Sequence, residues 1–160
     1  MNTKIPIANL DEKDASLIAS SLNKLLANEY AFFTKLLNFH WNVTGPRFNS
    51  LHNFFEESYT DQLTLMDEVA ERIRFLGESP RSTVSEMKSG MDLKEMNGKN
   101  LSSTDMISEL FEDSYKLQVF IKDTLVEKDL FKNDPGTEDF LVGVLQKHEM
   151  LSWKLNSYLS

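Results

Sequence analysis

Residues 11–48 read DEKDASLIASSLNKLLANEYAFFTKLLNFHWNVTGPRF, and this stretch sets the architecture of the chain. Apolar side chains recur at helical spacing from about Asp11 to Phe39, which predicts one long amphipathic helix. Asp11 or Asp14 is the expected cap at its start, because an aspartate side chain accepts a hydrogen bond from the first turn. Thr44-Gly45-Pro46 then ends the helical pattern, since Gly-Pro is a strong turn signal.

The rest of the chain repeats this pattern of long apolar stripes separated by breaks. We expect three more long helices, over about residues 48–76, 102–130 and 137–159. Ser102 or Ser103 is the expected cap of the middle one, and Thr137 of the last. In the long link between the second and third helices, only Val84 to Lys88 has the pattern of one or two helical turns. The fold class is therefore all-α: a four-helix bundle with a short extra helix in that link.

The composition is that of an ordinary globular domain. The 160 residues carry 25 acidic and 17 basic side chains, a net charge of −8, and no cysteine. The lack of cysteine excludes disulfide frameworks, thiolate zinc sites and cysteine-held iron–sulfur clusters. The negative charge disfavours broad adhesion to nucleic acid or anionic membranes, although it does not disfavour binding of cations. We expect a single domain over residues 1–160, with residues 1–10 as an N-terminal extension.

The sequence has no recognisable targeting segment. Its first residues lack the apolar stretch of a signal peptide. No window approaches the roughly 20 apolar residues of a membrane-spanning helix. We therefore expect a cytoplasmic protein with no membrane partner.

Few residues are available for chemistry, because the chain has only three histidines. His40 lies at the end of the first predicted helix and His52 near the start of the second, with Glu56 one turn later. Asp67 and Glu71 form another pair further along the second helix. On a helical wheel, the ligand candidates of this helix form one strip, rotated by roughly 120° from its apolar stripe. Imidazole and carboxylate without thiolate suit iron, manganese or zinc.

These candidate ligands divide into two half-sites. Glu56 and Asp67 are separated by about 16 Å along the helix axis, which one metal ion cannot bridge. His40, His52 and Glu56 therefore make one half-site, and Asp67 with Glu71 makes the other. If a second copy of the helix packs antiparallel about a two-fold axis, each half-site faces the complementary one. The spacing predicts two metal sites per dimer, each lying between subunits.

A diiron site inside the bundle is disfavoured. Such a site uses Glu-x-x-His on two of its helices, and this motif does not occur here. His148 has Leu145 three positions before it, so we interpret His148 as structural. Structural alternatives remain open for the other candidates too, because a single helical histidine is more often structural and an acidic strip is more often a solvated face. The convergence of two histidines and two carboxylate pairs in one register favours the metal site.

Three runs of the sequence carry a family resemblance. They are HWNVTGPRF at residues 40–48, LHNFFE at residues 51–56 and MDEVAERIR at residues 66–74. Together they resemble the signature of the Dps family, the mini-ferritins also called DNA-binding proteins from starved cells. The resemblance covers nearly the whole chain and implies a ferritin-like four-helix bundle.

The resemblance also implies a ferroxidase that stores iron. Members form a hollow dodecameric shell, oxidise Fe(II), usually with hydrogen peroxide, and keep the Fe(III) as mineral. Their oxidation centre lies at a two-fold interface. Carried over, His40, His52 and Glu56 of one subunit meet Asp67 and Glu71 of its neighbour. Many members have aspartate in place of Glu56, so the geometry at that ligand is left open.

Two further roles are implied by the resemblance. Trp41, beside His40, is a candidate for electron transfer or radical quenching, with interface packing as an equal alternative. Members also have carboxylate-lined channels at a three-fold axis, and the matching residues are Asp134, Glu138 and Asp139. Three copies would attract cations to an iron-uptake channel. The alternative for this acidic turn is stabilisation of the helix N-terminus.

Strong DNA binding is not expected. Members that bind DNA usually have a mobile tail rich in lysine and arginine, whereas residues 1–14 carry only Lys4 and Lys13 against three acidic residues. A shell of such acidic subunits repels phosphate unless divalent cations bridge the two. The competing hypothesis is a DNA-compacting or surface-interaction shell whose metal site is vestigial.

Overall fold

The computed structural model describes residues 5–160, and over that range the chain is helical and contains no strand. The long helices are α1 (Glu12–Asn42), α2 (Phe48–Phe75), α4 (Ser103–Val126) and α5 (Pro135–Leu159). The short ones are α3 (Val84–Gly90) and the 3₁₀ turns η1 (Gly98–Asn100) and η2 (Lys128–Phe131). This confirms the predicted all-α bundle with an extra helix in its middle link. Within the described range, no helix is both long and apolar enough to span a membrane.

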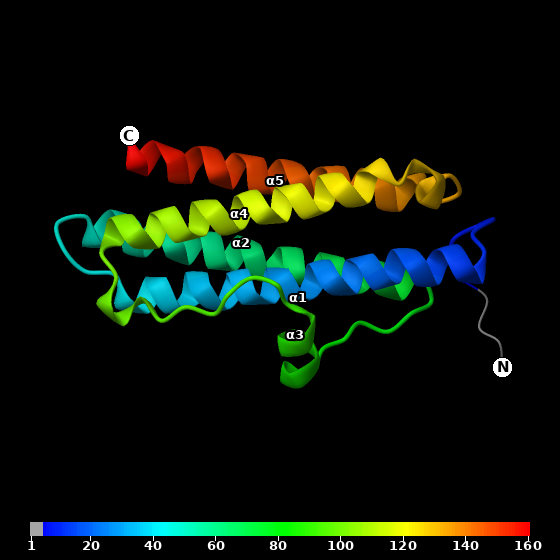
Figure 1. Ribbon diagram of the computed structural model, residues 1–160, viewed down its shortest axis with the longest axis horizontal. Helices are drawn as coiled ribbons and strands as arrows, with labels where there is room; N and C mark the ends of the chain where they lie inside the picture. The colour runs from blue at the N-terminus through cyan, green and yellow to red at the C-terminus, as the bar shows by residue number, and fades with distance from the viewer. Residues whose placement is uncertain (1–4) are drawn as a thin grey trace.

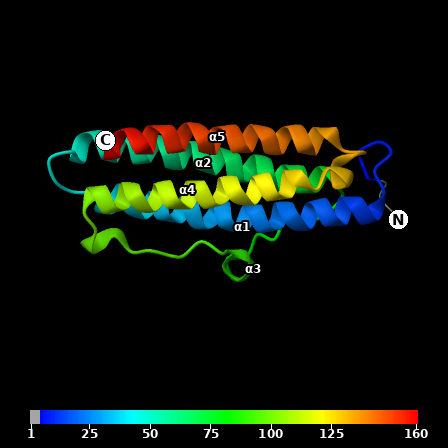
Figure 2. The same ribbon diagram turned by 45° about the horizontal axis from the view of Figure 1, so that its top comes forward.

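The four long helices lie side by side in one bundle (Figure 1). α1 runs antiparallel to α2, and α4 runs antiparallel to α5. The link from α2 to α4 travels back along the outside of α1, as both views show (Figures 1 and 2). Within this link, α3 packs on the outer face of α1 and its Met87 is buried. The C-terminus lies at the end of the bundle that holds the α1–α2 loop.

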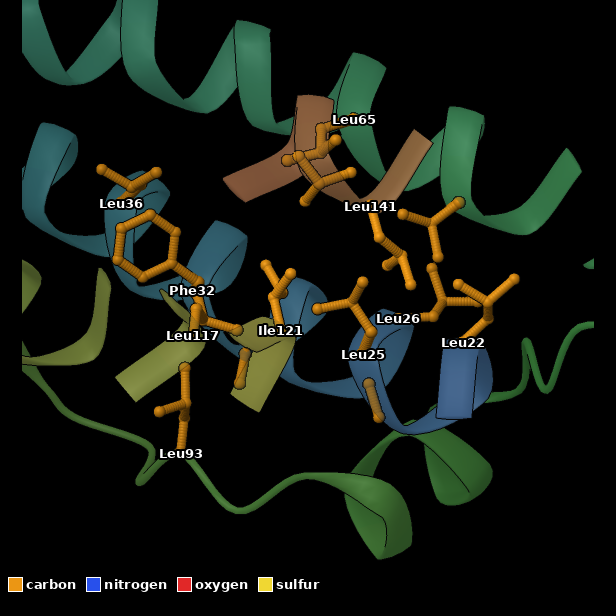
Figure 3. Close-up of a cluster of buried hydrophobic side chains, with 14 of the residues drawn as sticks. Leu22, Leu25, Leu26, Phe32, Leu36, Leu65, Leu93, Leu117, Ile121 and Leu141 are labelled. Carbon is orange, nitrogen blue, oxygen red and sulfur yellow. The ribbon is translucent and has the colours of Figure 1, made fainter. Parts of the chain in front are cut away.

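The core forms around the apolar stripe of α1 (Figure 3). Leu25, Phe32 and Leu36 are fully buried. Burying one such side chain contributes about 1.5–3 kcal/mol relative to leaving it exposed. The same cluster includes side chains from the other long helices: Leu65 of α2, Leu117 and Ile121 of α4, and Leu141 of α5.

Three asparagines of α1 hold the long link against the bundle. Asn23 Oδ1 accepts a hydrogen bond from the backbone N–H of Arg81 at 2.7 Å. Asn28 Oδ1 accepts from two backbone N–H groups, those of Asp92 at 2.8 Å and Leu93 at 3.0 Å. Near the end of α1, Asn38 Oδ1 accepts from the N–H of Gly98 at 2.7 Å. The irregular link thus obtains the backbone hydrogen bonds that it cannot make with itself.

Two predicted helix ends differ from the structure. α4 ends at Val126 rather than near Leu130, and the chain continues into η2, where Phe131 is buried. α5 begins at Pro135 and is capped by Asp134, not by Thr137. Proline is well suited to the first helical position, where its missing N–H has no partner to lose. The caps expected at Asp11 and Ser102 are both present.

The expected N-terminal extension is partly packed on the bundle. Residues 1–4 of it, including Lys4, lie outside the described residues. Leu10 is buried, and Ile5 and Ile7 pack against the core. The described part of the extension therefore contributes to the hydrophobic core.

Candidate metal centre

His40 of α1 and His52 of α2 form a reciprocal pair near the loop that joins the two helices. His40 Nδ1 lies 2.9 Å from the backbone oxygen of His52, and His52 Nδ1 lies 3.0 Å from the backbone oxygen of His40. The two rings are stacked, with centroids 3.9 Å apart and an interplanar angle of 22°. Because a carbonyl oxygen can only accept a hydrogen bond, each Nδ1 carries a proton and donates it.

This pairing uses the Nδ1 atoms and leaves the Nε2 atoms of His40 and His52 available to bind a metal ion. In a neutral imidazole protonated at Nδ1, the lone pair resides on Nε2. Metal-binding histidines are commonly oriented in this way, with one nitrogen bonded to a carbonyl and the other directed to the metal. The pair is therefore arranged as two preoriented imidazole donors, one from each helix.

Aromatic rings support the histidine pair. Phe48 stacks on His52 with ring centroids 5.0 Å apart, and Tyr59 and His40 form a T-shaped pair with centroids 5.2 Å apart. His40 is 8% exposed, whereas the neighbouring Trp41 is 68% exposed. Trp41 thus remains on the surface of the single chain, and its proposed roles remain predictions.

The carboxylates of α2 lie beside the core rather than in it. Glu56, Asp67 and Glu71 are all exposed, whereas the apolar stripe of the same helix is buried, as at Phe55 and Val69. The wheel predicted this separation of the strip from the core. Glu56 follows His52 by one helical turn on the same face, so these two side chains can face a common ion.

One chain does not bring the two half-sites together. Glu56 and Asp67 belong to one straight helix and are separated by about 16 Å along its axis. Among the described residues, no group of three or more His, Asp or Glu side chains is close enough to hold a metal ion. The imidazoles and carboxylates have the right chemistry for iron, but the described residues of one chain do not gather a complete ligand set.

The interior of the bundle holds a polar cluster that the sequence analysis did not identify. Glu29 of α1 is fully buried, and its Oε1 lies 2.8 Å from His148 Nε2 of α5. Gln62 of α2 donates to the other oxygen of Glu29, and Ser114 of α4 donates to the backbone oxygen of His148. An in-bundle diiron site has a carboxylate on every helix, so this cluster is a different arrangement. The available signal was a charged residue, Glu29, on the apolar stripe of α1.

The start of α5 uses one of the three predicted channel carboxylates internally. Asp134 is 1% exposed, and its Oδ1 accepts from the N–H of Thr137 at 3.0 Å and from Arg72 Nη2 at 3.1 Å. A carboxylate buried within its own chain is not available to line a channel. The channel hypothesis is therefore restricted to Glu138, which is half-buried, and Asp139, which is exposed.

Comparison with known proteins gives these features a family context. A ferritin-like domain family matches residues 19–160. The chain is 35% identical over 156 residues to an uncharacterised low temperature-induced protein of Nostoc sp., which covers 98% of this chain and 87% of that relative. It is also 35% identical over 139 residues to DNA protection during starvation protein 2 of Bacillus anthracis, covering 87% and 94% of the two chains. The chain belongs to the Dps family of ferritin-like proteins.

Solved Dps structures agree with this assignment. The crystal structure of a Dps protein from Vibrio cholerae O1 matches the whole of this chain with a TM-score of 0.89 and 30% identity. That protein is described as a member of a broad superfamily of ferritin-like diiron-carboxylate proteins. The resemblance found in the sequence is thereby confirmed, and Dps membership supports a general role in iron storage or protection.

Proposed function

We propose that this Dps protein is a ferroxidase that takes up Fe(II), oxidises it at sites shared between subunits and stores the Fe(III) as mineral. Each site would combine His40, His52 and Glu56 of one subunit with Asp67 and Glu71 of another. The subunits would form a hollow homo-oligomeric shell, with the dodecamer expected from the family resemblance.

The reciprocal histidine pair is the observation that carries this proposal. Two backbone carbonyls hold the two rings in the tautomer that leaves Nε2 free to bind a metal ion, at hydrogen-bond distances of 2.9 and 3.0 Å. A histidine with a purely structural role needs a partner, but it does not need a second preoriented imidazole stacked on it. Asp67 and Glu71 lie too far along α2 from His52 and Glu56 to share one ion with them. This distance supports a site that is completed by a second subunit.

The residues divide the chemistry between them. The imidazoles of His40 and His52 would bind Fe(II), while the harder carboxylate oxygens of Glu56, Asp67 and Glu71 would favour the Fe(III) product. With peroxide as oxidant, two Fe(II) ions each lose one electron, the peroxide O–O bond breaks, and hydrolysis of the Fe(III) product releases protons to water. Holding the ions at a fixed site keeps this two-electron reduction in one place, so hydroxyl radicals do not escape.

The sharpest test combines two broken subunits in one shell. A His52→Ala subunit and an Asp67→Ala/Glu71→Ala subunit are each expected to lose Fe(II) oxidation by at least about tenfold, since even outer-shell changes at metal sites cost 10–100-fold. In a mixed dimer, however, one shared site keeps every ligand, and the other carries the substitutions of both half-sites. Mixed shells should therefore recover activity, measured as Fe(III) absorbance with and without peroxide.

The controls separate a shared site from a general loss of function. Glu57→Ala alters an exposed carboxylate adjacent to Glu56 and should behave as the unaltered protein. A variant that stays monomeric should be inactive although it retains all the ligands. Mixed shells of verified composition that recover nothing would contradict the shared site, and an unaltered shell that does not oxidise Fe(II) would contradict the function itself.

A further inference from the structure

Arg72 connects α2, the helix that carries Asp67 and Glu71, to the start of α5. Its Nε donates to Thr137 Oγ1 at 2.8 Å, and its Nη2 donates to Asp134 Oδ1 at 3.1 Å. The guanidinium also lies over the ring of Phe75, 5.6 Å from its centroid. Thr137 Oγ1 in turn donates to the second oxygen of Asp134. The two side-chain hydrogen bonds fix the guanidinium against the start of α5, and the cation–π contact with Phe75 of α2 holds it from the other side of the contact.

Gly136 makes the close approach of this arginine possible. A Cβ atom built on Gly136 would lie 2.8 Å from Arg72 Nη2, closer than such atoms pack in proteins. Gly136 occupies the first turn of α5, between Pro135 and Thr137. Any side chain at this position would displace the guanidinium, although the end of an arginine side chain can move without unfolding the helix.

Arg72 lies next in the sequence to a proposed metal ligand, so its contact with α5 bears on the position of that ligand. It directly follows Glu71, a ligand of the proposed oxidation site, close to the end of α2 at Phe75. The last turn of a helix lacks intrahelical partners for its carbonyls, so its orientation depends more than usual on tertiary contacts. Successive helical residues point about 100° apart, so Arg72 can bind α5 while Glu71 remains exposed.

The middle of α2 offers little alternative support from α5. A groove of about 650 Å³ separates the two helices, lined by Phe54, Ser58 and Leu65 of α2 and by Gly143 and Leu151 of α5. At the edge of the groove, Lys147 Nζ pairs with Glu68 Oε2 at 2.5 Å, but both side chains are substantially exposed. Such surface pairs contribute little. The largely buried Arg72 contact is thus the firmer tie between the two helices at this end.

We propose that Arg72 is a positioning residue for the acidic half-site, holding the end of α2 against the α5 N-terminus so that Asp67 and Glu71 keep the geometry that a metal ion requires. This rests on the proposed function. Arg72 itself touches neither the ion nor its ligands. It acts through its hydrogen bonds to Asp134 and Thr137, which the absence of a side chain at Gly136 permits.

Two substitutions break the contact in different ways. Arg72→Lys keeps the positive charge but loses the planar fork that binds Asp134 and Thr137 together. Gly136→Ala changes no polar group and displaces the guanidinium by one added carbon. Gly143→Ala is the matched control, because it is the same substitution on the same helix and its Cβ would have no neighbour within 4 Å.

Metal affinity is the decisive measurement. Assembled shells of each variant are titrated with Co(II) alone, followed by its visible absorbance, and His52→Ala defines the signal of the proposed site. We expect Arg72→Lys and Gly136→Ala each to weaken Co(II) binding about tenfold, in line with other outer-shell changes, while Gly143→Ala binds as the unaltered shell. In Fe(II) oxidation, the same two variants should raise KM more than they lower kcat.

A double-variant cycle distinguishes positioning from general destabilisation. Because lysine presents no guanidinium to collide with a new Cβ, Arg72→Lys/Gly136→Ala should bind Co(II) as weakly as Arg72→Lys alone. Additive losses, or variants whose thermal midpoint falls while Co(II) affinity stays equal to that of Gly143→Ala, would overturn the positioning role. Absence of His52-dependent Co(II) binding in the unaltered shell would instead overturn the proposed function.

Discussion

The Asp134 carboxylate is buried and makes its hydrogen bonds within its own chain, so it is not available to line a channel. Its carboxylate caps α5 and binds Arg72 at 1% exposure. Removing one partner of a buried charge pair is costly because the remaining charge loses its compensation. Glu138 and Asp139, in contrast, keep exposed surface at the same helix start.

These residues therefore have separable effects when substituted. Asp134→Ala should lower the free energy of unfolding by at least about 1–2 kcal/mol, the usual cost of losing a helix cap alone, because it also removes the partner of Arg72. This loss is measured as a lower thermal midpoint. Glu138→Gln/Asp139→Asn should leave the midpoint unchanged but slow Fe(II) uptake by up to about tenfold at low salt, because it removes the attraction for cations. The slowing should shrink as ionic strength rises. An uptake rate that is unchanged at low salt would assign Glu138 and Asp139 to helix stabilisation alone.

At the scale of a single element, α3 depends on its capping box. Thr83 Oγ1 accepts from the N–H of Glu86, and the Glu86 carboxylate accepts from both the N–H and the hydroxyl of Thr83. Hydrogen bonds from the Thr83 backbone, then from its side chain, hold the pKa of Glu86 below its ordinary value of 4.5. The ionised carboxylate therefore stabilises this short helix above the ordinary pKa, and that contribution is lost as the pH falls through the lower folded value.

This predicts a local acid transition in α3. Amide protection from hydrogen exchange over Val84–Gly90, corrected for intrinsic exchange rates, should fall as the pH is lowered from about 5 to 3. The long helices should remain protected over the same range. In Glu86→Gln the α3 step should be absent, since no carboxylate is left to protonate. A step of the same size in that variant would assign the transition to another group.

At the scale of the whole molecule, charge governs which partners the protein can accept. With a net charge of −8 per chain, assembled subunits carry a strongly negative field. Association with duplex DNA requires lysine and arginine to replace the counterions around its phosphates. Relatives are named for DNA protection, and oxidising and sequestering iron is a way of protecting DNA that requires no contact with it.

We therefore expect no shift of duplex DNA by the assembled protein at neutral pH and physiological salt without divalent cations. The measurement is a gel-shift series, repeated at low salt and with added Mg²⁺, which could bridge acidic protein and phosphate. Binding without cations that weakens steeply with salt would reveal a local basic surface and would favour the DNA-compacting hypothesis.

Much of this protein was predictable from its sequence, because the relevant signals are local. The apolar period of α1 and α2, the turn at Gly45-Pro46 and the lack of strand patterns specify the helices before any long-range contact is known. The placement of the acidic strip beside the core follows from the same period, since a helix fixes the angles between its own side chains. The predicted division into two half-sites likewise rests on helical rise, because Glu56 and Asp67 are far apart along one helix axis.

Only the tertiary structure decided which side chains meet across the bundle. Glu29 and His148 are 119 residues apart in the sequence, and the residues around each one do not indicate that the two side chains pair. The reciprocal hydrogen bonds of His40 and His52 depend on how α1 and α2 pack against each other. The pairing of Asp134 with Arg72 depends on the close approach of the guanidinium to Gly136. Periodicity determines which face of a helix a residue occupies, but the partner on that face is set by how the helices pack, and packing is a property of the whole chain.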